Sequence, residues 1–286
     1  MPNTRFAEHL SVVLELPENH PILNAVTLPA RWQVLRSPPM DGAWNMACDL
    51  WMMEVAKSTG NGILRVYSWS RPTVSFGRNE RALDHYSAES LAAAGLDAVR
   101  RPTGGRALLH SREVTYAVAI PIPQDTTWQA AYDATNQIVL SAMQILGVPA
   151  EIVGEDTATT TDTLPRGAPC FAGASRGEIA VNGAKLVASA VWRDRAAFLQ
   201  HGSILLHDDQ MLLTTIANSG IPLPEPAAAL SGLLTQIPSF DAVANAIEVA
   251  TKQIADVVTW KLSADDTTAI KKVREQLEQT SWLWRS

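Results

Sequence analysis

The run RRPTGGRALLHSREVTY, residues 100–116, joins two arginines and a proline-led turn to a Gly-Gly pair and a strand-like tail. Gly104 and Gly105 can adopt backbone angles that are closed to other residues, and they let a ligand lie against the main chain. Arg101 and the neighbouring arginines surround this backbone with positive charge. The pattern predicts a loop that binds a ligand with an anionic or strongly polar head. An ordinary turn with solvated arginines explains the same residues equally well.

The composition narrows the class of protein. With 286 residues, 47% of them apolar and 18% charged, the chain resembles a soluble globular protein. A net charge of −6 argues against a general nucleic-acid binder. No apolar stretch approaches the roughly 20 residues of a membrane span. We see no export signal and only two cysteines, so we expect a cytoplasmic protein without disulfides. The six histidines show no metal-ligand spacing, and we expect no metal.

Helix and strand patterns alternate along the chain. We expect an N-terminal extension over residues 1–30, a main domain over 31–206, and a helical C-terminal segment over 207–286 that packs on the same domain. In the main domain the patterns predict strands at 31–36, 63–69, 73–76, 114–120 and 196–206, and helices at 42–57, 87–94 and 128–146. In the C-terminal segment they predict helices at 208–218, 240–260 and 264–279.

The clearest local signal is a β-hairpin centred on Asn182-Gly183, the preferred two-residue turn between strands. Because side chains alternate across a strand, we expect the second strand to place on one face Lys185, Val187, Ser189 and Val191. Alanines keep this strand low in bulk. The strand is therefore predicted to leave a slot for an alkyl chain opposite the Gly-Gly loop.

Cys170 follows a long polar loop, residues 154–169, and comes just before the hairpin. A lysine that approaches a thiol favours the thiolate by Coulomb attraction. Lowering the pKa of Cys170 by about 1.5 needs roughly 2 kcal/mol, which one ammonium in a partly dry site can supply. Cys170 and Lys185 are therefore a candidate catalytic pair, with a buried cysteine and a surface lysine as the alternative. Cys48 lies in a densely apolar helix and is expected to be a core residue.

Several motifs, in order along the chain, resemble the superfamily of lipoate and biotin protein ligases and transferases. Residues 100–116 are similar to its signature RRPTGGRAVLHxxELTYS, and the resemblance covers about Trp32 to Leu206. The other matching residues are Asn45, Met46 and Asp49; Trp69, Pro72, Ser75 and Gly77; Pro169, Cys170 and Phe171; Lys185, Ser189 and Ala190; and QHGSIL at 200–205. The resemblance implies an α+β fold with mixed, largely antiparallel sheets packed with helices, and it makes 31–206 the catalytic domain.

Cys170 indicates the branch of this superfamily. Octanoyltransferases with a cysteine–lysine dyad have Cys-Phe here and a hairpin lysine downstream, as in this chain, whereas lipoate–protein ligases activate their acid with ATP and need no such cysteine. The resemblance implies that an octanoyl group moves from octanoyl-acyl-carrier protein to Cys170, and then to a lysine of a lipoyl-accepting domain such as the glycine-cleavage H protein. No cofactor is implied, and neither nucleic acid nor a membrane is expected as a partner. An ATP-dependent ligase, a transferase between lipoyl domains and a non-catalytic binder of acylated partners remain alternatives.

The resemblance also assigns roles to residues. Cys170 would be the nucleophile, and Lys185 would lower its pKa and handle the proton of the incoming amine. The residues expected to bind substrate are Arg101, Gly104, Gly105, His110, Ser189, His201 and Gly202. Either histidine fits a hydrogen-bonded core residue equally well. The family usually has Gly-Ser-Ala-Gln where this chain has ASAV at 188–191, which leaves the preferred acyl length open.

Overall fold

The computed structural model describes residues 28–122, 127–159, 164, 167–218, 221, 225–278 and 283–284. Nearly all of the expected N-terminal extension therefore lies outside the described residues. No helix in these described ranges is both long and apolar enough to cross a membrane.

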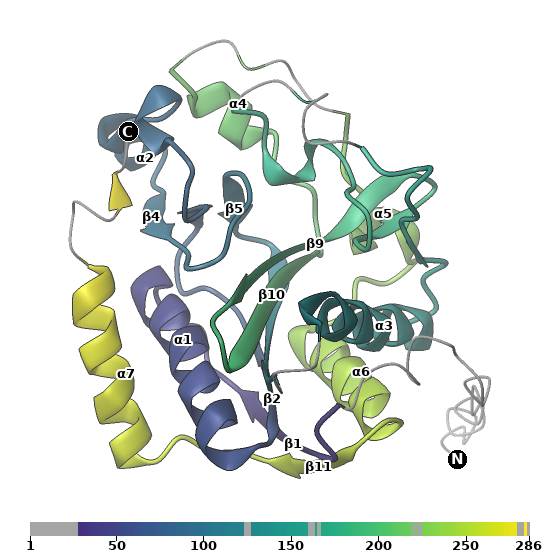
Figure 1. Ribbon diagram of the computed structural model, residues 1–286. Helices are drawn as coiled ribbons and strands as arrows, with labels where there is room; N and C mark the ends of the chain where they lie inside the picture. Colours follow the sequence, from purple (N-terminus) through teal and green to yellow (C-terminus); the bar gives the residue numbers. More distant parts are fainter. Residues whose placement is uncertain are drawn as a thin grey trace, which may run out of the picture.

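Two sheets form the framework (Figure 1). The main sheet has eight strands in the order β11 (Asp256–Thr259), β1 (Arg31–Arg36), β2 (Gly62–Tyr67), β6 (Glu113–Pro121), β10 (Ala197–Leu205), β9 (Ala184–Arg193), β8 (Ile179–Val181) and β7 (Glu151–Ile152). Only the pairs β11–β1 and β1–β2 are parallel. The small sheet has the order β4 (Asp97–Arg100), β3 (Thr73–Phe76) and β5 (Leu108–His110). The expected mixed, largely antiparallel α+β fold is confirmed.

Helices cover both faces of the main sheet (Figure 1). One face packs against α3 (Trp128–Ile145) and α6 (Phe240–Lys252), and the other against α1 (Gly42–Thr59), which carries α7 (Ala264–Leu277) on its outer side. The alternation along β6 divides the two cores, because Val118 joins the first and Ala117 and Ala119 join the second. The shorter helices are α2 (Ala88–Ala93), α4 (Leu212–Ile216) and α5 (Leu230–Leu233).

Capping residues set the ends of α1, which carries part of the site. The Asp41 carboxylate accepts a hydrogen bond from the Trp44 N–H at 2.9 Å, which satisfies a free donor of the first turn. Gly60 ends the helix in the left-handed region, with φ of 72°. Cys48 lies inside this helix and is fully buried, so its expected place in the core is confirmed.

The hairpin forms at the predicted turn, and Asn182 and Gly183 have φ of 50° and 79°, as the tight two-residue turn requires. The predicted side-chain phase of its second strand is wrong. Consecutive residues Ile179 and Ala180 of β8 face Val187 and Lys185 of β9, so one extra residue is inserted in β9. Such a bulge shifts the alternation by one position.

The bulge separates Lys185 from the residues that were expected to share its face. Val187 packs in the core under α3, and the Ser189 hydroxyl lies 3.3 Å from the Tyr132 hydroxyl on that same helix. Lys185 instead reaches Cys170, and Ala188 packs with Cys170 on the opposite side of the sheet. The lysine therefore shares a side with Ala188 and Ala190.

The C-terminal segment differs from the expected all-helical form. The helix predicted at 240–260 ends at Lys252, and residues Asp256–Thr259 form β11, which pairs in parallel with β1. The sequence DVVT is β-branched at three positions, and it adds an edge strand to the main sheet. This segment is therefore part of the sheet as well as of the helical layers.

Candidate active site

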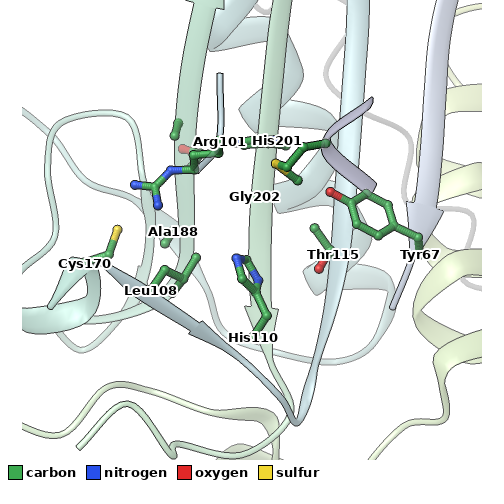
Figure 2. A pocket seen from close by; sticks show the side chains of 12 residues that line it. Tyr67, Arg101, Leu108, His110, Thr115, Cys170, Ala188, His201 and Gly202 are labelled. Atoms are coloured by element: carbon green, nitrogen blue, oxygen red, sulfur yellow. The ribbon is translucent and has the colours of Figure 1, made fainter. Parts of the chain in front are cut away.

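A narrow pocket opens beside Cys170, between α1, the small sheet and the strands β9 and β10 (Figure 2). It encloses about 340 Å³ of space between atoms, including the part that is open to solvent. Its lining residues are Met46, Tyr67, Arg101, Leu108, His110, Thr115, Cys170, Ala188, Ser189, Ala190, His201 and Gly202. Figure 2 shows Cys170 beside Leu108 and Ala188, at the side of the pocket away from Tyr67. The thiol thus lies next to the apolar side chains of Leu108 and Ala188.

The pocket unites six of the nine residues predicted for the site. Those that line it are Cys170, Arg101, His110, Ser189, His201 and Gly202. Lys185 is outside the lining, but its ammonium contacts the main-chain carbonyl of Cys170. Gly104 and Gly105 are outside the lining, so their contact with substrate stays a prediction.

Cys170 begins a single 3₁₀ turn, Cys170–Ala172, which follows the long polar loop. Its N–H donates to the Ala107 carbonyl at 2.9 Å, which ties the turn to the segment entering β5. The Lys185 ammonium donates to the Cys170 carbonyl at 2.7 Å and pairs with the Glu178 carboxylate at 2.7 Å. Both charged side chains are buried, so the ion pair fixes the main chain that carries the thiol.

Burial raises the pKa of the Cys170 thiol above its ordinary value. The positive charges of Lys185 and Arg101 lower this pKa, whereas the negative charges of Glu178 and Glu80 raise it further. The expected net lowering of this pKa by Lys185 is therefore wrong for the structure. The lysine does act in the predicted direction, but the loss of water outweighs it, and Glu178 offsets part of its charge.

Arg101 holds the Gly-Gly loop through main-chain contacts. Its guanidinium donates to the carbonyls of Ser75 at 2.8 Å, Gly104 at 3.0 Å and Arg106 at 2.7 Å. Gly105 has φ of 94°, and a Cβ there would lie 2.7 Å from the Arg101 guanidinium. These contacts explain the glycine by close packing within the protein.

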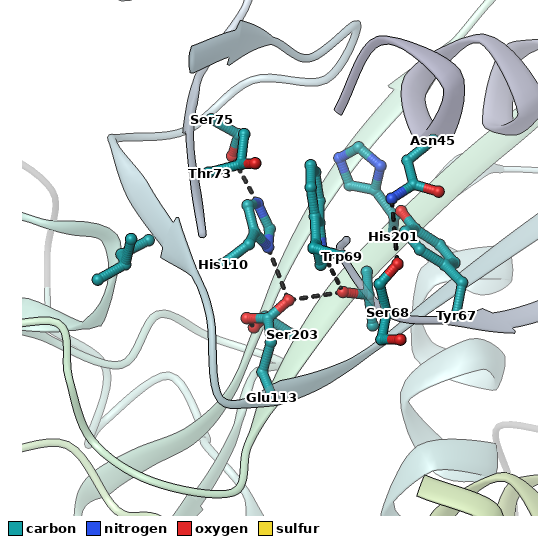
Figure 3. Close-up of polar contacts among 12 residues, drawn as sticks. Asn45, Tyr67, Ser68, Trp69, Thr73, Ser75, His110, Glu113, His201 and Ser203 are labelled. Carbon is teal, nitrogen blue, oxygen red and sulfur yellow. Dashed lines mark hydrogen bonds and ion pairs between the residues drawn. The ribbon is translucent and has the colours of Figure 1, made fainter. Parts of the chain in front are cut away.

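His110 lies in a continuous chain of buried hydrogen bonds (Figure 3). Its Nδ1 lies 2.7 Å from the Glu113 carboxylate, its Nε2 lies 2.8 Å from the Ser75 hydroxyl, and the ring stacks on Trp69. Arg101 donates to that same hydroxyl at 2.9 Å. The histidine thus lines the pocket and is also a satisfied core residue, with both ring nitrogens engaged.

His201 belongs to a second buried network, which borders the pocket through His201 and Tyr67. Its ring nitrogens contact the Thr103 hydroxyl at 2.6 Å and the Asp49 carboxylate at 3.1 Å. Asp49 also pairs with Arg65 at 2.8 Å and accepts from the Tyr67 hydroxyl at 2.8 Å. Burial lowers the pKa of His201, although Asp49 acts in the opposite direction, so the neutral ring is favoured near pH 7.

Sequence reasoning missed Arg65 and Glu178, which anchor the two sides of the site. Glu178 precedes the hairpin turn by four positions, where a charged residue is typical of a solvated strand end, yet it is 4% exposed. Arg65 stands in a strand of otherwise apolar residues, GILRVY. That charged residue in a buried strand was the available signal, because a buried charge requires a partner.

Comparison with known proteins identifies the family. The family described as "Lipoyl protein ligase A/B catalytic domain" matches residues 41–252. The chain belongs to this family. An octanoyltransferase LipM from Exiguobacterium sp. is 35% identical over 272 residues, which cover 89% of this chain and 98% of the relative. Another, from Kyrpidia tusciae, is 38% identical over 193 residues, 65% of this chain and 69% of that protein.

Solved structures share the fold of this family member. A lipoate-protein ligase A bound with ATP has a TM-score of 0.73 at 19% identity, with 90% of this chain and 99% of that chain covered. The bipartite lipoate protein ligase of Thermoplasma acidophilum has a TM-score of 0.71 at 17% identity, with 90% and 97% covered. These solved structures show the fold, whereas the family match and the LipM relatives place the chain among the acyltransferases of LipM type in lipoate biosynthesis.

Proposed function

We propose that this acyltransferase carries the octanoyl group as a thioester on Cys170. The supporting observation is that the Cys170 thiol lines a narrow pocket with apolar walls while Lys185 is bonded to the carbonyl of the same residue. Octanoyl-acyl-carrier protein is the donor, and a lysine on a lipoyl-accepting domain, such as the glycine-cleavage H protein, is the acceptor. These partners place the enzyme in the cytoplasm.

The reaction balances in two steps without a nucleotide. Cys170 sulfur attacks the carbonyl carbon of the donor thioester, a new C–S bond forms, and the donor thiol leaves with the proton that Cys170 gives up. The acceptor amine then attacks the Cys170 thioester, a C–N bond forms, and the amine proton returns to the Cys170 sulfur. Exchange between thioesters is nearly balanced in free energy, and formation of the amide drives the sequence.

Three residues at the thiol have separate roles in this reaction. Cys170 is protonated at rest because burial raises its pKa. The Lys185 ammonium stabilises the thiolate as it forms, and Glu178 holds that ammonium in place. Entry of the octanoyl chain removes more water from the pocket, and this strengthens the attraction between Lys185 and the sulfur.

Intact-mass measurement after incubation with octanoyl-acyl-carrier protein tests the proposal. The parent should gain one octanoyl group without ATP, Cys170→Ala should gain none, and the matched control Cys48→Ala should behave as the parent. Absence of the adduct together with ATP–pyrophosphate exchange would indicate a ligase. Binding of acylated partners with no turnover would indicate a non-catalytic binder. Faster acylation by an octanoylated lipoyl domain would assign the donor to the transferase between lipoyl domains.

A further inference from the structure

The outer edge of β9 is unpaired beside the active site. β10 pairs with β9 from Val187 to Arg193, whereas β8 pairs with β9 only over residues 184–187. Within the described part of the chain, no strand pairs with the other edge of residues 188–193. This edge is partly exposed from Ser189 to Trp192.

The free edge presents main-chain hydrogen-bonding groups at alternate residues. The Ser189 N–H donates to the Glu178 carboxylate at 3.2 Å, so it points away from β10. In an antiparallel pair, every second residue directs both its N–H and its C=O away from the partner strand. Val191 therefore directs both groups outward, and Ser189 directs its carbonyl outward. Together they offer one N–H and two C=O groups to an incoming chain.

A groove runs along this edge and reaches the pocket. It encloses about 600 Å³, including the part that is open to solvent, and its lining residues are Trp128, Gln129, Tyr132, Asp133, Arg176, Ser189 and Val191. Ser189 lines both the groove and the Cys170 pocket. A ligand that lies along the edge therefore contacts a residue that also lines the Cys170 pocket.

The charges of the groove favour a neutral, amide-bearing ligand. Arg176 and Asp133 carry opposite charges in the same lining, and Glu155 pairs with Arg176 at 3.3 Å. An anion such as a phosphate would gain little from this balance. Trp128 and Tyr132 supply apolar walls, and the edge of β9 supplies the hydrogen bonds.

We propose that the edge of β9 at Ser189–Val191 binds the amide-bearing pantetheine arm of the acyl donor. This inference rests on the proposed thioester donor. Pantetheine has two amides separated by two methylene groups, so equivalent atoms of the two amides lie about 5 Å apart in the extended arm. One amide can therefore reach the Ser189 C=O while the other reaches the Val191 N–H. The amides pair with the outward N–H and C=O groups, and the thioester end reaches Cys170 past Ser189. The mode is strand addition by a small molecule.

Two donors and two variants test the inference. The kcat/KM for acylation of Cys170 is measured with S-octanoyl-pantetheine and with S-octanoyl-2-mercaptoethanol, which has no amide. Val191→Pro removes the outward N–H, and proline is tolerated at a strand edge whose N–H is free of the ladder. Val191→Ala is the matched control that keeps the N–H. Thermal unfolding checks that both variants fold.

On the parent, the pantetheine donor should react at least tenfold faster than the amide-free donor. Val191→Pro should lower the ratio of the two kcat/KM values five- to tenfold, as expected for one lost hydrogen bond, whereas Val191→Ala should keep it. Equal kcat/KM values for the two donors on the parent would overturn the inference. So would a folded Val191→Pro variant in which the ratio of the two kcat/KM values is unchanged. A Val191→Pro variant that acylates Cys170 normally but transfers the octanoyl group slowly to the acceptor would also overturn it, because the edge would then bind the acceptor.

Failure of the proposed function looks different, because no thioester would then acylate Cys170 of the parent. Octanoyl-coenzyme A and octanoyl-acyl-carrier protein share the pantetheine arm and should both show the effect of Val191→Pro. The one with the higher kcat/KM on the parent identifies the source of the arm.

Discussion

Replacing Lys185 with methionine separates the structural and chemical roles of the buried ion pair. The side chains of Lys185 and Glu178 are 3% and 4% exposed, and their charged atoms lie 2.7 Å apart. Removing one partner of a buried pair strands the other charge and costs about 3–5 kcal/mol. Glu178 keeps two main-chain donors, the N–H groups of Ser175 at 2.7 Å and Ser189 at 3.2 Å. These contacts favour the lower end, a loss of about 3 kcal/mol in the free energy of unfolding.

The double variant Lys185→Met/Glu178→Gln removes both charges. Because whole buried pairs are often replaced at little cost, the free energy of unfolding should return to within about 1 kcal/mol of the parent. Acylation of Cys170 should stay slow, since the cation that lowers the thiol pKa is absent. Glu178→Gln alone keeps the ammonium and removes a charge that raises the pKa. Its thiolate should therefore form at lower pH than in the parent.

Urea denaturation followed by tryptophan fluorescence measures the stability of the four proteins, and intact mass over time measures the octanoyl-enzyme. A double variant as unstable as Lys185→Met would refute the assignment of the lost stability to a stranded Glu178 charge. A double variant that acylates at the parental rate would refute the role of the ammonium in the reaction.

Two further predictions concern the thiol and the glycine loop. In a Cys48→Ala background, the rate of alkylation by iodoacetamide should rise with a midpoint above the ordinary pKa of cysteine, because burial raises the pKa of Cys170; a midpoint near neutrality would contradict this. Gly77→Ala should lower the free energy of unfolding by about 1–3 kcal/mol, because its Cβ would overlap the Gly105 carbonyl. Gly104→Ala has open space around its Cβ and should change stability little, so equal losses in the two variants would show that the overlap is relieved.

Local sequence signals predicted much of the fold. The first strand falls at the predicted residues 31–36, and the turn at Asn182-Gly183 forms as its two positive φ angles require. These features depend on the conformational preferences of neighbouring residues, which can be predicted from the sequence alone. The strand at residues 256–259 was missed because its four residues lie inside the helical pattern predicted over 240–260, and only pairing with β1 gives them an extended form.

The site was predicted as a set of residues, but its electrostatics were not. The approach of Lys185 to Cys170 followed from the motif, and the buried carboxylate of Glu178 did not. A glutamate at the start of a strand is usually solvated, and only the tertiary structure shows that it shares the lysine charge. The net pKa of Cys170 depends on burial, which spacing along the sequence does not report.

The bulge in β9 places the Lys185 ammonium on the side of the sheet that carries the Cys170 pocket. Regular alternation from Ala188 and Ala190, which line the pocket, would place Lys185 on the α3 side of the sheet with Val187. The extra residue shifts the phase, so that Lys185 faces Cys170 while the small residues downstream still form the wall beside the thiol. Pairing with β8 also ends at Val187, one residue after the extra residue, and there the edge of β9 becomes free beside the groove. One inserted residue therefore positions the ammonium, keeps the alanine wall in place and precedes the edge that we assign to the donor arm.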